Sequence, residues 1–220
     1  MISDLYAFPP AKVAQTDALT SQLIMAHRRL AELKGVAPLL PNQEILLNTL
    51  ALQEAKDSSA IENIITSHDE LFKQELDIPQ FNNAAAKEVG RYSEALKLGF
   101  TRVSAKGKLT LDDLVAIQAV LVIGEPGPGI RTRPGTIVGN SVTREVIYTP
   151  PQDFDQIVEL LERLLIFFNE DGDGELDPLV RMALIHYQFE KIHPFYDGNG
   201  RTGRILNLLY LVQHGLLDLP

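Results

Sequence analysis

Most of the chain carries hydrophobic residues at the spacing of an α-helix. Between residues 16 and 34 the apolar positions recur close to every 3.6 residues, and Gly35 follows as a stop signal. Asn42 can cap a second helix, whose apolar side begins at Ile45. Further helical patterns cover residues 82–98, 110–122, 153–169, 177–192 and 201–214. The pattern therefore predicts an all-α fold.

One stretch, residues 124–151, interrupts this periodicity. It opens with GEPGPG, which cannot be helical, and continues with two short β-prone runs on either side of Gly139-Asn140-Ser141. The Pro150-Pro151 pair closes it. We find no internal repeat in the sequence, so we expect a helical bundle that carries one β-hairpin.

Composition limits the chemistry that the chain can perform. Its 220 residues predict one domain, or one domain with a small extension. A net charge of −9 argues against a large basic surface that binds nucleic acid or an anionic membrane, so any phosphate site must be local. The absence of cysteine excludes disulfides, thiolate metal sites and a cysteine nucleophile.

The ends of the chain add two expectations. The N-terminus lacks the basic start and apolar run of a signal peptide, and no stretch is apolar enough to span a membrane, so we expect a cytoplasmic protein. The sequence ends at Pro220, shortly after the last predicted helix, which suggests that the natural fold continues beyond it.

The densest run of unusual residues is HYQFEKIHPFYDGNGRTGR, residues 186–204. A helix that ends near Ile192 would deliver His193, and the proline after it prevents easy continuation. Gly198 and Gly200 free the backbone to turn its N–H groups inward. The next helix begins close by, so its positive dipole end would point into the same loop.

Charged residues complete this pattern. Arg201 and Arg204 are three residues apart, on one face of a helix, and can both reach an anion. Asp197 would be repelled by bare phosphates but could hold a divalent cation that bridges them. Together these residues indicate a site for nucleotide phosphoryl or nucleotidyl transfer.

Other interpretations of the same residues remain open. GNGRTG matches the G-x-G-x-x-G pattern of dinucleotide folds, with Asp218 as the ribose-binding acid, although its glycines follow a helix rather than a strand. His186, Glu190 and His193 share one helical face and could bind zinc, which leaves the glycines and arginines unexplained. The remaining alternative is a plain glycine turn with a core histidine and two solvent-facing arginines.

The acidic loop at residues 169–177, NEDGDGELD, imitates a calcium-binding loop. With Gly174 at the invariant sixth position, Val180 stands where the bidentate glutamate belongs. A solvated turn between helices is therefore the favoured interpretation.

HPFYDGNGRTGR, residues 193–204, resembles the full signature of the Fic (filamentation induced by cAMP) family. That signature is His-Pro-Phe, two residues, Gly-Asn-Gly-Arg, two residues and Arg, with an acid before the first glycine, and every position is matched. Residues 130–151 resemble the family's flap hairpin. The resemblance implies an N-terminal helical extension over 1–80, with an inhibitory helix at about 56–66. It also implies a Fic-type helical core over 81–220.

The resemblance implies transfer of AMP from ATP to a Ser, Thr or Tyr hydroxyl of a target protein, with release of pyrophosphate. His193 would be the general base, and Phe195 would anchor the loop in the core. Asp197 would coordinate Mg²⁺. The nucleotide would be bound by the rest of the signature: Gly198, Asn199 and Gly200 as an anion hole, Arg201 at the β-phosphate, Arg204 at the γ-phosphate, and Thr202 and Gly203 between them.

The flap has two implied roles. Val138, Gly139, Asn140 and Ser141 would lie beside the nucleotide, and the Glu145–Tyr148 strand would pair with an extended segment of the target protein. A plain surface hairpin is the alternative. Part of the adenine pocket in this family comes from helices after the signature, so we expect that wall to be incomplete here.

A shorter motif implies regulation. SSAIEN, residues 58–63, matches the family's inhibitory pattern through Ser58, Glu62 and Asn63. Glu62 would pair with Arg204 and keep it from the γ-phosphate. The alternative is a helix-capping serine followed by a surface glutamate.

Two further functions stay open: removal of AMP from a modified protein, with Glu62 positioning a water, and a non-catalytic regulator that senses ATP. The implied partners are ATP and a target protein, or a second copy of the chain as the modified substrate. Apolar stripes on the N-terminal helices could also serve a homodimer. No partner membrane or nucleic acid is expected.

Overall fold

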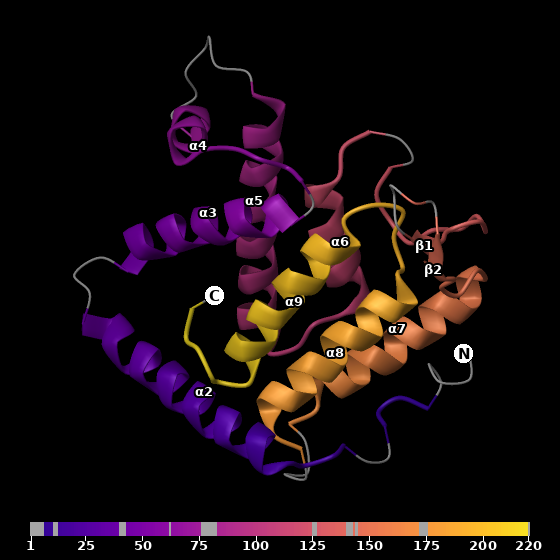
Figure 1. Ribbon diagram of the computed structural model, residues 1–220. Coiled ribbons are helices and arrows are strands. Elements are labelled where there is room, and N and C mark those ends of the chain that lie inside the picture. Colours follow the sequence, from indigo (N-terminus) through magenta and orange to yellow (C-terminus); the bar gives the residue numbers. More distant parts are fainter. Residues whose placement is uncertain are drawn as a thin grey trace.

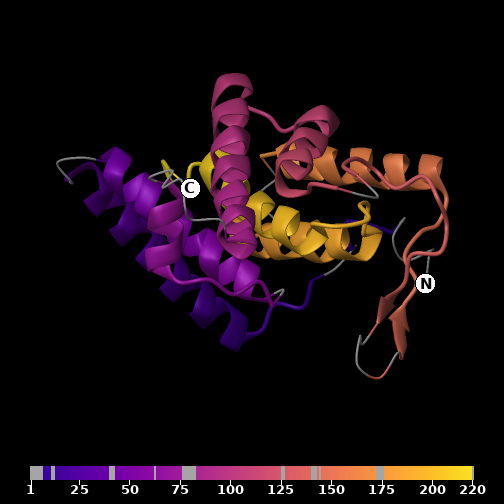
Figure 2. The same cartoon turned by 90° about the horizontal axis from the view of Figure 1, so that it is seen from above.

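Helices make up most of the structure, a computed structural model that describes residues 7–10, 13–39, 43–61, 63–75, 83–124, 127–139, 143, 145–171 and 176–219. In chain order (Figure 1) the elements are α2 (Asp17–Val36), the 3₁₀ turn η1 (Ala37–Leu39), α3 (Gln43–Ile61), α4 (His68–Glu75), α5 (Ala84–Lys106), α6 (Leu111–Leu121), β1 (Val138–Gly139), β2 (Val146–Tyr148), α7 (Phe154–Asn169), α8 (Pro178–Ile192) and α9 (Asn199–Gln213). The predicted all-α bundle with one β-hairpin is confirmed, and Figure 2 shows the hairpin standing out from the bundle. Among the described residues no helix is long and apolar enough to cross a membrane.

Local signals set most helix ends. Asp177 caps α8 by accepting a hydrogen bond from the backbone N–H of Leu179, and Pro178 occupies the first turn. The α5 helix runs further than its periodicity predicted and ends at Gly107, which has a φ of 66°. The short helix α4 was not predicted from the pattern.

The α9 helix lies at the centre of the bundle and contacts α3, α5, α6 and α8 (Figure 1). Two glycines allow these close approaches. A Cβ on Gly99 of α5 would lie 2.7 Å from the Cδ1 of Leu209. A Cβ on Gly203 of α9 would lie 2.8 Å from the Oε1 of Glu190 in α8. The absence of a Cβ at these two positions thus lets α9 pack closely against α5 and α8.

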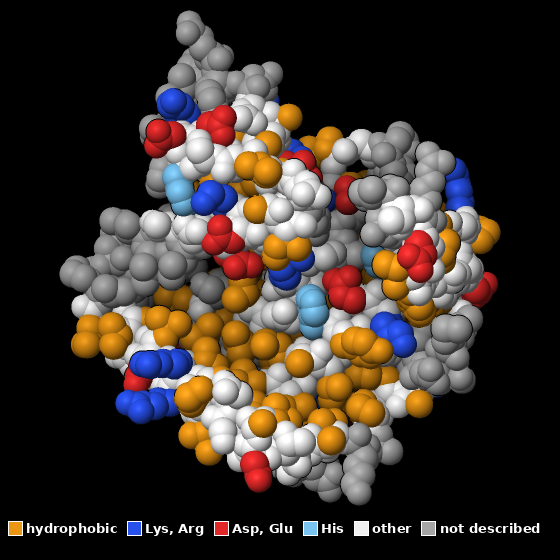
Figure 3. Space-filling model, in the orientation of Figure 1, with side chains coloured by type: hydrophobic (Ala, Val, Ile, Leu, Met, Phe, Trp, Pro, Cys, Tyr) orange, Lys and Arg blue, Asp and Glu red, His pale blue; other side chains and the backbone are white. Residues whose placement is uncertain are grey.

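The α2 helix is attached differently, because none of its residues is buried. Polar contacts hold it at its middle and near its C-terminal end: His27 Nε2 lies 2.8 Å from Asp177 Oδ2, and Lys34 Nζ donates to the carbonyl of Gly215 at 2.7 Å. Ile24 is 66% exposed, and Figure 3 shows apolar side chains gathered beside this helix. The expected homodimer stays a prediction.

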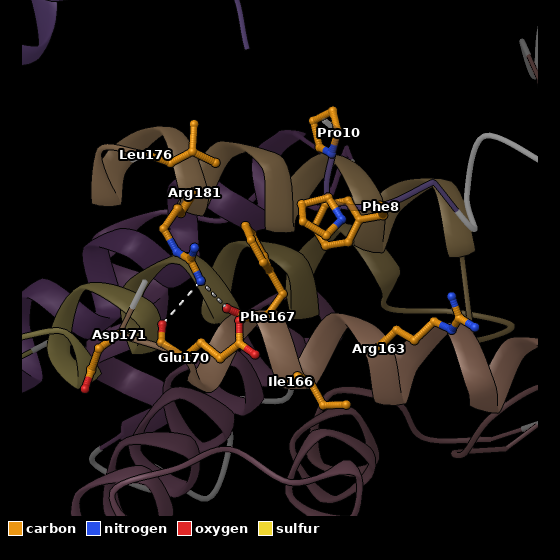
Figure 4. A pocket seen from close by; sticks show the side chains of 10 residues that line it. Phe8, Pro10, Arg163, Ile166, Phe167, Glu170, Asp171, Leu176 and Arg181 are labelled. Atoms are coloured by element: carbon orange, nitrogen blue, oxygen red, sulfur yellow. Dashed lines mark hydrogen bonds between the residues drawn. The ribbon is translucent and has the colours of Figure 1, made fainter. Parts of the chain in front are cut away.

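A cavity of about 730 Å³ lies beside the N-terminal segment, at the opposite end of α8 from His193. Figure 4 shows its lining, where the ring of Phe8 packs edge-to-face on Phe167 with centroids 4.9 Å apart. Arg181 donates to the carbonyls of Phe167 and Glu170 at 2.8 and 3.3 Å. The ring contact fastens the N-terminal segment to α7, and the bonds of Arg181 join α8 to the C-terminal end of α7.

A charged cluster joins α5 to α6. The side chain of Asp113 is fully buried and accepts hydrogen bonds from Arg102 at 2.9 Å and from Lys106 at 2.7 Å. Thr110 completes a capping box with it. Burial raises the pKa of Asp113, but the hydrogen bonds from Lys106, Thr110 and Arg102 outweigh this effect and lower the pKa to about 2.

We expect Asp113→Asn to lower the free energy of unfolding at pH 7 by about 2 kcal/mol, because the folded pKa lies below the unfolded value of about 4. A depressed pKa stabilises the fold above the unfolded pKa, so this contribution should disappear as the pH falls from about 4 to about 2. Urea denaturation across this range measures it, with exposed Asp112→Asn as the control. Equal losses for both variants would contradict the prediction.

Candidate active site

The signature loop connects α8 to α9 and begins at an unusual backbone conformation. His193 has φ 48° and ψ 60°, in the left-handed region, and its N–H donates to the carbonyl of Phe189 at 2.9 Å. Few residues other than glycine adopt this conformation, so neighbouring contacts must hold it. The imidazole is thereby presented at the end of α8.

Asn199 holds the middle of the loop. Its Oδ1 accepts from the backbone N–H of Phe195 at 2.9 Å, and its Nδ2 donates to the carbonyl of the same residue at 2.9 Å. Phe195 is fully buried, as expected for a core anchor. The side chain of Asn199 therefore supports the loop from inside, which leaves only its backbone N–H for the expected anion hole.

The segment that leads into the hairpin runs along the same loop. Ile130 and Phe195 form an antiparallel β-bridge. The Tyr196 hydroxyl accepts from the backbone N–H of Arg133 at 2.8 Å. These contacts place the base of the flap against the catalytic loop.

Gln118, fully buried in α6, joins the two segments. Its Nε2 donates to the carbonyl of Asp197 at 3.0 Å, and its Oε1 accepts from the N–H of Gly129 at 2.9 Å. Only a side chain with both a donor and an acceptor can bind the Asp197 carbonyl and the Gly129 N–H together. This requirement explains why the amide of Gln118 lies on the buried face of α6.

His193 is surrounded by groups that disfavour its protonation. Burial lowers its pKa most, and the positive charge of Arg131 lowers the pKa further. A neutral imidazole at pH 7 can accept a proton, as a general base must.

Arg201 lies almost fully buried, at 2% exposure. Its Nη1 contacts Glu88 Oε1 of α5 at 2.6 Å, and its Nη2 contacts Asp197 Oδ1 at 3.2 Å. The carboxylate of Asp197 is 56% exposed and also accepts from the N–H of Gly198. The aspartate thus stays accessible while its orientation is fixed.

A single exposed carboxylate fits the way proteins bind Mg²⁺, which is held by one or two carboxylates together with substrate phosphates and waters. The described residues contain no group of three or more His, Asp or Glu side chains that could hold a metal by themselves. Asp197 would therefore hold the ion jointly with a nucleotide.

The N-terminus of α9 faces the loop without a capping side chain. Gly198 is its N-cap at φ 79°, where a Cβ would also approach Val122 to 3.1 Å. The first N–H groups of a helix have no intrahelical partner, so they can bind an anion. Thr202 is fully buried and Gly203 packs against α8, so these two expected nucleotide ligands lie on the packed side of α9.

Arg204 is held by the end of α3. Its Nε donates to the hydroxyl of Ser58, and its Nη2 donates to the carbonyl of Ser58 at 3.0 Å. Glu62 lies outside the described residues. The helix ends at Ile61 rather than at the predicted 66, and Asn63 follows at φ 63°.

The flap hairpin pairs Val138 with Tyr148 in antiparallel register, and Gly139 is required because a Cβ there would lie 2.5 Å from the carbonyl of Glu145. Ile147 is 72% exposed on its outer strand. Lys191 Nζ lies 5.5 Å from the ring centroid of Tyr148, which places this strand beside the end of α8. Asn140 and Ser141 lie outside the described residues.

The rival interpretations lack support in the structure. His193 leaves the helical path of α8, so it does not share a face with His186, and no zinc-binding group forms among the described residues. The glycines follow a helix rather than a strand, and Asp218 pairs with Lys34 of α2 at 3.1 Å. In the calcium-like loop, residues 172–175 lie outside the described residues.

Sequence reasoning missed three residues that shape this site: Glu88, Gln118 and Arg131. Each contacts the loop from an element more than sixty residues away in the chain. Their spacing carries no signal, because the contacts exist only once the helices are packed.

Comparisons with known proteins agree with this geometry. A family model described as "Fic/DOC family N-terminal" matches residues 20–101, and one described as "Fic/DOC family" matches residues 108–211. A probable protein adenylyltransferase from Aquifex aeolicus is 31% identical over 185 residues, which cover 84% of this chain and 54% of that protein. Protein adenylyltransferase fic-1 from Caenorhabditis elegans is 28% identical over 109 residues, covering 49% of this chain and 20% of that protein. The chain therefore matches only part of each of these relatives.

Solved structures share the fold. A Fic family protein from Desulfovibrio desulfuricans superposes with a TM-score of 0.68 at 23% identity, over 91% of this chain and 59% of that one. Fic-1 from C. elegans superposes with a TM-score of 0.67 at 22% identity, over 97% of this chain and 66% of that one.

We expect Asn199→Ala to lower the free energy of unfolding by about 2 kcal/mol, because both peptide groups of buried Phe195 would lose their partners. Urea denaturation measures the loss. Asn207→Ala is the control on the same helix, since the Oδ1 of Asn207 has no hydrogen-bond partner among the described residues. A loss no larger than that of the control would contradict the role given to Asn199.

Proposed function

The chain belongs to the Fic/DOC family, and from this premise we propose that it is an autoinhibited protein adenylyltransferase that transfers AMP from ATP to a protein hydroxyl. The observation that carries the proposal is the loop between α8 and α9. It brings an imidazole, an exposed carboxylate and the open N-terminus of a helix together within one turn.

His193 would take the proton from the attacking Ser, Thr or Tyr hydroxyl. The oxygen would then form a bond to the α-phosphorus of ATP, and pyrophosphate would leave. The lowered pKa of His193 supports this role, because the imidazole is ready to accept a proton at neutral pH. Since no covalent intermediate with the protein is needed, the remaining groups act by position and charge.

The phosphates would lie at the N-terminus of α9. The backbone N–H groups of Asn199 and Gly200 and the side chain of Arg201 are placed to stabilise negative charge there. Asp197 would hold Mg²⁺, which would neutralise part of the negative charge of the phosphates. Arg201 is oriented by Glu88, which fixes its guanidinium before any nucleotide binds.

Autoinhibition is supported by the contact between α3 and Arg204. Ser58 belongs to the same short motif as Glu62, and both its hydroxyl and its carbonyl already engage this arginine. We infer that Glu62 adds a carboxylate to the same side of the site and competes with the γ-phosphate of ATP for Arg204. The inhibitory motif would thus be the C-terminal end of α3 and the residues that follow it.

The target protein would dock on the flap. Val146 and Ile147 are exposed on β2, and this edge of the two-stranded sheet can accept an extended segment by strand addition. The β2 strand lies beside the end of α8, so a docked segment would pass close to His193.

We expect Glu62→Gly to raise transfer of label from α-labelled ATP to protein at least about tenfold, because a charge-assisted contact with Arg204 is typically worth 1.5–3 kcal/mol. His193→Ala should abolish transfer in either background. Autoradiography of the chain incubated with Mg²⁺ and cell lysate measures both effects.

Glu62→Gln is the matched control, because it keeps the side-chain length and removes the charge, and it should activate as Glu62→Gly does. Equal labelling by wild type and Glu62→Gly would contradict autoinhibition. Labelling that persists in His193→Ala would contradict the proposed base.

Ser58→Ala should activate less than Glu62→Gly, because the carbonyl of Ser58 still accepts from Arg204 after the hydroxyl is lost. The same labelling assay ranks the two variants. Activation by Ser58→Ala equal to that of Glu62→Gly would show that the hydroxyl alone holds the arginine.

A further inference from the structure

Arg131 is a buried cation without an acidic partner. It is 1% exposed, and no carboxylate lies within ion-pair distance of it in the part of the chain that the structure describes. A buried charge normally needs an opposite charge or a full set of hydrogen bonds. Its retention at this point therefore calls for a specific role.

Two nitrogens of the Arg131 guanidinium, Nε and Nη2, are bound by backbone carbonyls instead, and the buried Nη1 has no hydrogen-bond partner among the described residues. Its Nε donates to the carbonyl of His193 at 2.8 Å, and its Nη2 donates to that of Ile192 at 3.3 Å. The same Nη2 also donates to the carbonyl of Pro151, at the end of the flap. One side chain thus joins the C-terminus of α8, the proposed general base His193 and the end of the flap at Pro151.

These contacts act on the backbone of His193 itself. The residue is held at φ 48° and ψ 60°, which is unfavourable for a side chain with a Cβ. The direction of its carbonyl follows from ψ, so a donor fixed to that oxygen also fixes the conformation. Without the donor, the peptide can rotate towards an extended conformation and turn the imidazole away.

We propose that Arg131 is a positioning residue of the active site, which holds His193 in its reactive orientation and couples that orientation to the base of the flap. This inference rests on the proposed function. The Arg131 side chain is 1% exposed, so its effect should fall on the turnover step and not on nucleotide binding.

Other contacts keep the segment in place without this side chain. The backbone N–H of Arg131 donates to the carbonyl of Pro194 at 2.9 Å, Ile130 bridges to Phe195, and the hydroxyl of Tyr196 accepts from the backbone of Arg133. Substitution of the guanidinium should therefore leave the path of the chain intact.

The test uses the full chain in the activated Glu62→Gly background and compares Arg131→Met and Arg131→Lys with Arg133→Met. Arg133 is exposed two residues away and serves as the matched control. Steady-state labelling gives kcat and the KM for ATP, and thermal denaturation checks folding. We expect Arg131→Met to lower kcat about 100-fold while the KM for ATP changes less than about threefold, because misplacing a catalytic group has an effect of this size.

Arg131→Lys should recover part of kcat, since an ammonium can reach one of the three carbonyls, and Arg133→Met should match the parent. A folded Arg131→Met variant with the parental kcat would overturn the inference. If Arg131→Met does not fold, Arg131→Lys decides, and an unchanged kcat in that variant overturns it equally.

The two proposals fail in different ways. A Glu62→Gly parent that transfers no label contradicts the proposed function, whatever Arg131 does. In that case, hydrogen–deuterium exchange of the loop peptide still tests the positioning role. Faster exchange in Arg131→Lys than in Arg133→Met, confined to the loop, supports it, and equal exchange overturns it.

Discussion

The active loop depends on hydrogen-bond partners for peptide groups that are buried outside any helix or sheet. Such groups are costly to leave unpaired. The side chain of Asn199 pairs with the peptide groups of Phe195. The side chain of Gln118 donates to the carbonyl of Asp197, and that of Arg131 donates to the carbonyl of His193. Each donor or acceptor comes from a different element, so the loop takes its shape only when α6, α9 and the flap segment are all in place. The chemistry is therefore supported by the whole bundle.

The sequence was sufficient for the fold class and for recognising the signature between two helices, because both depend on local order along the chain. Helical periodicity can be recognised in a single sequence. So can a proline after a histidine and glycines before a helix. The supporting residues could not be predicted in this way. Arg131 meets His193 across 62 residues and Glu88 meets Arg201 across 113, and nothing in either neighbourhood indicates the pairing. The burial of Thr202 and the packing of Gly203 against α8 could not be predicted from the signature either, and their contact with the nucleotide stays a prediction.

Both arginines of the signature are engaged by groups of the protein itself. Arg201 is held by Glu88 and Asp197, and Arg204 is held by Ser58. If the site binds a triphosphate as proposed, the two arginines would exchange oxygen acceptors of the protein for phosphate oxygens. Such an exchange makes affinity and reaction geometry depend on the placement of α3 and α5, which lie on the N-terminal side of the chain.

The two close helix approaches at Gly99 and Gly203 have a consequence for how this protein can vary. Both lie where α9 packs closely, and the arginines project from that same helix. A methyl group added at either glycine would force a neighbouring side chain or α9 itself to shift, and any shift of α9 would be larger at the guanidinium groups, which stand at the ends of long side chains. Core and candidate site are therefore not separable targets for mutation: a change that keeps the interior apolar and leaves the signature intact can still displace the two arginines through a small movement of one helix.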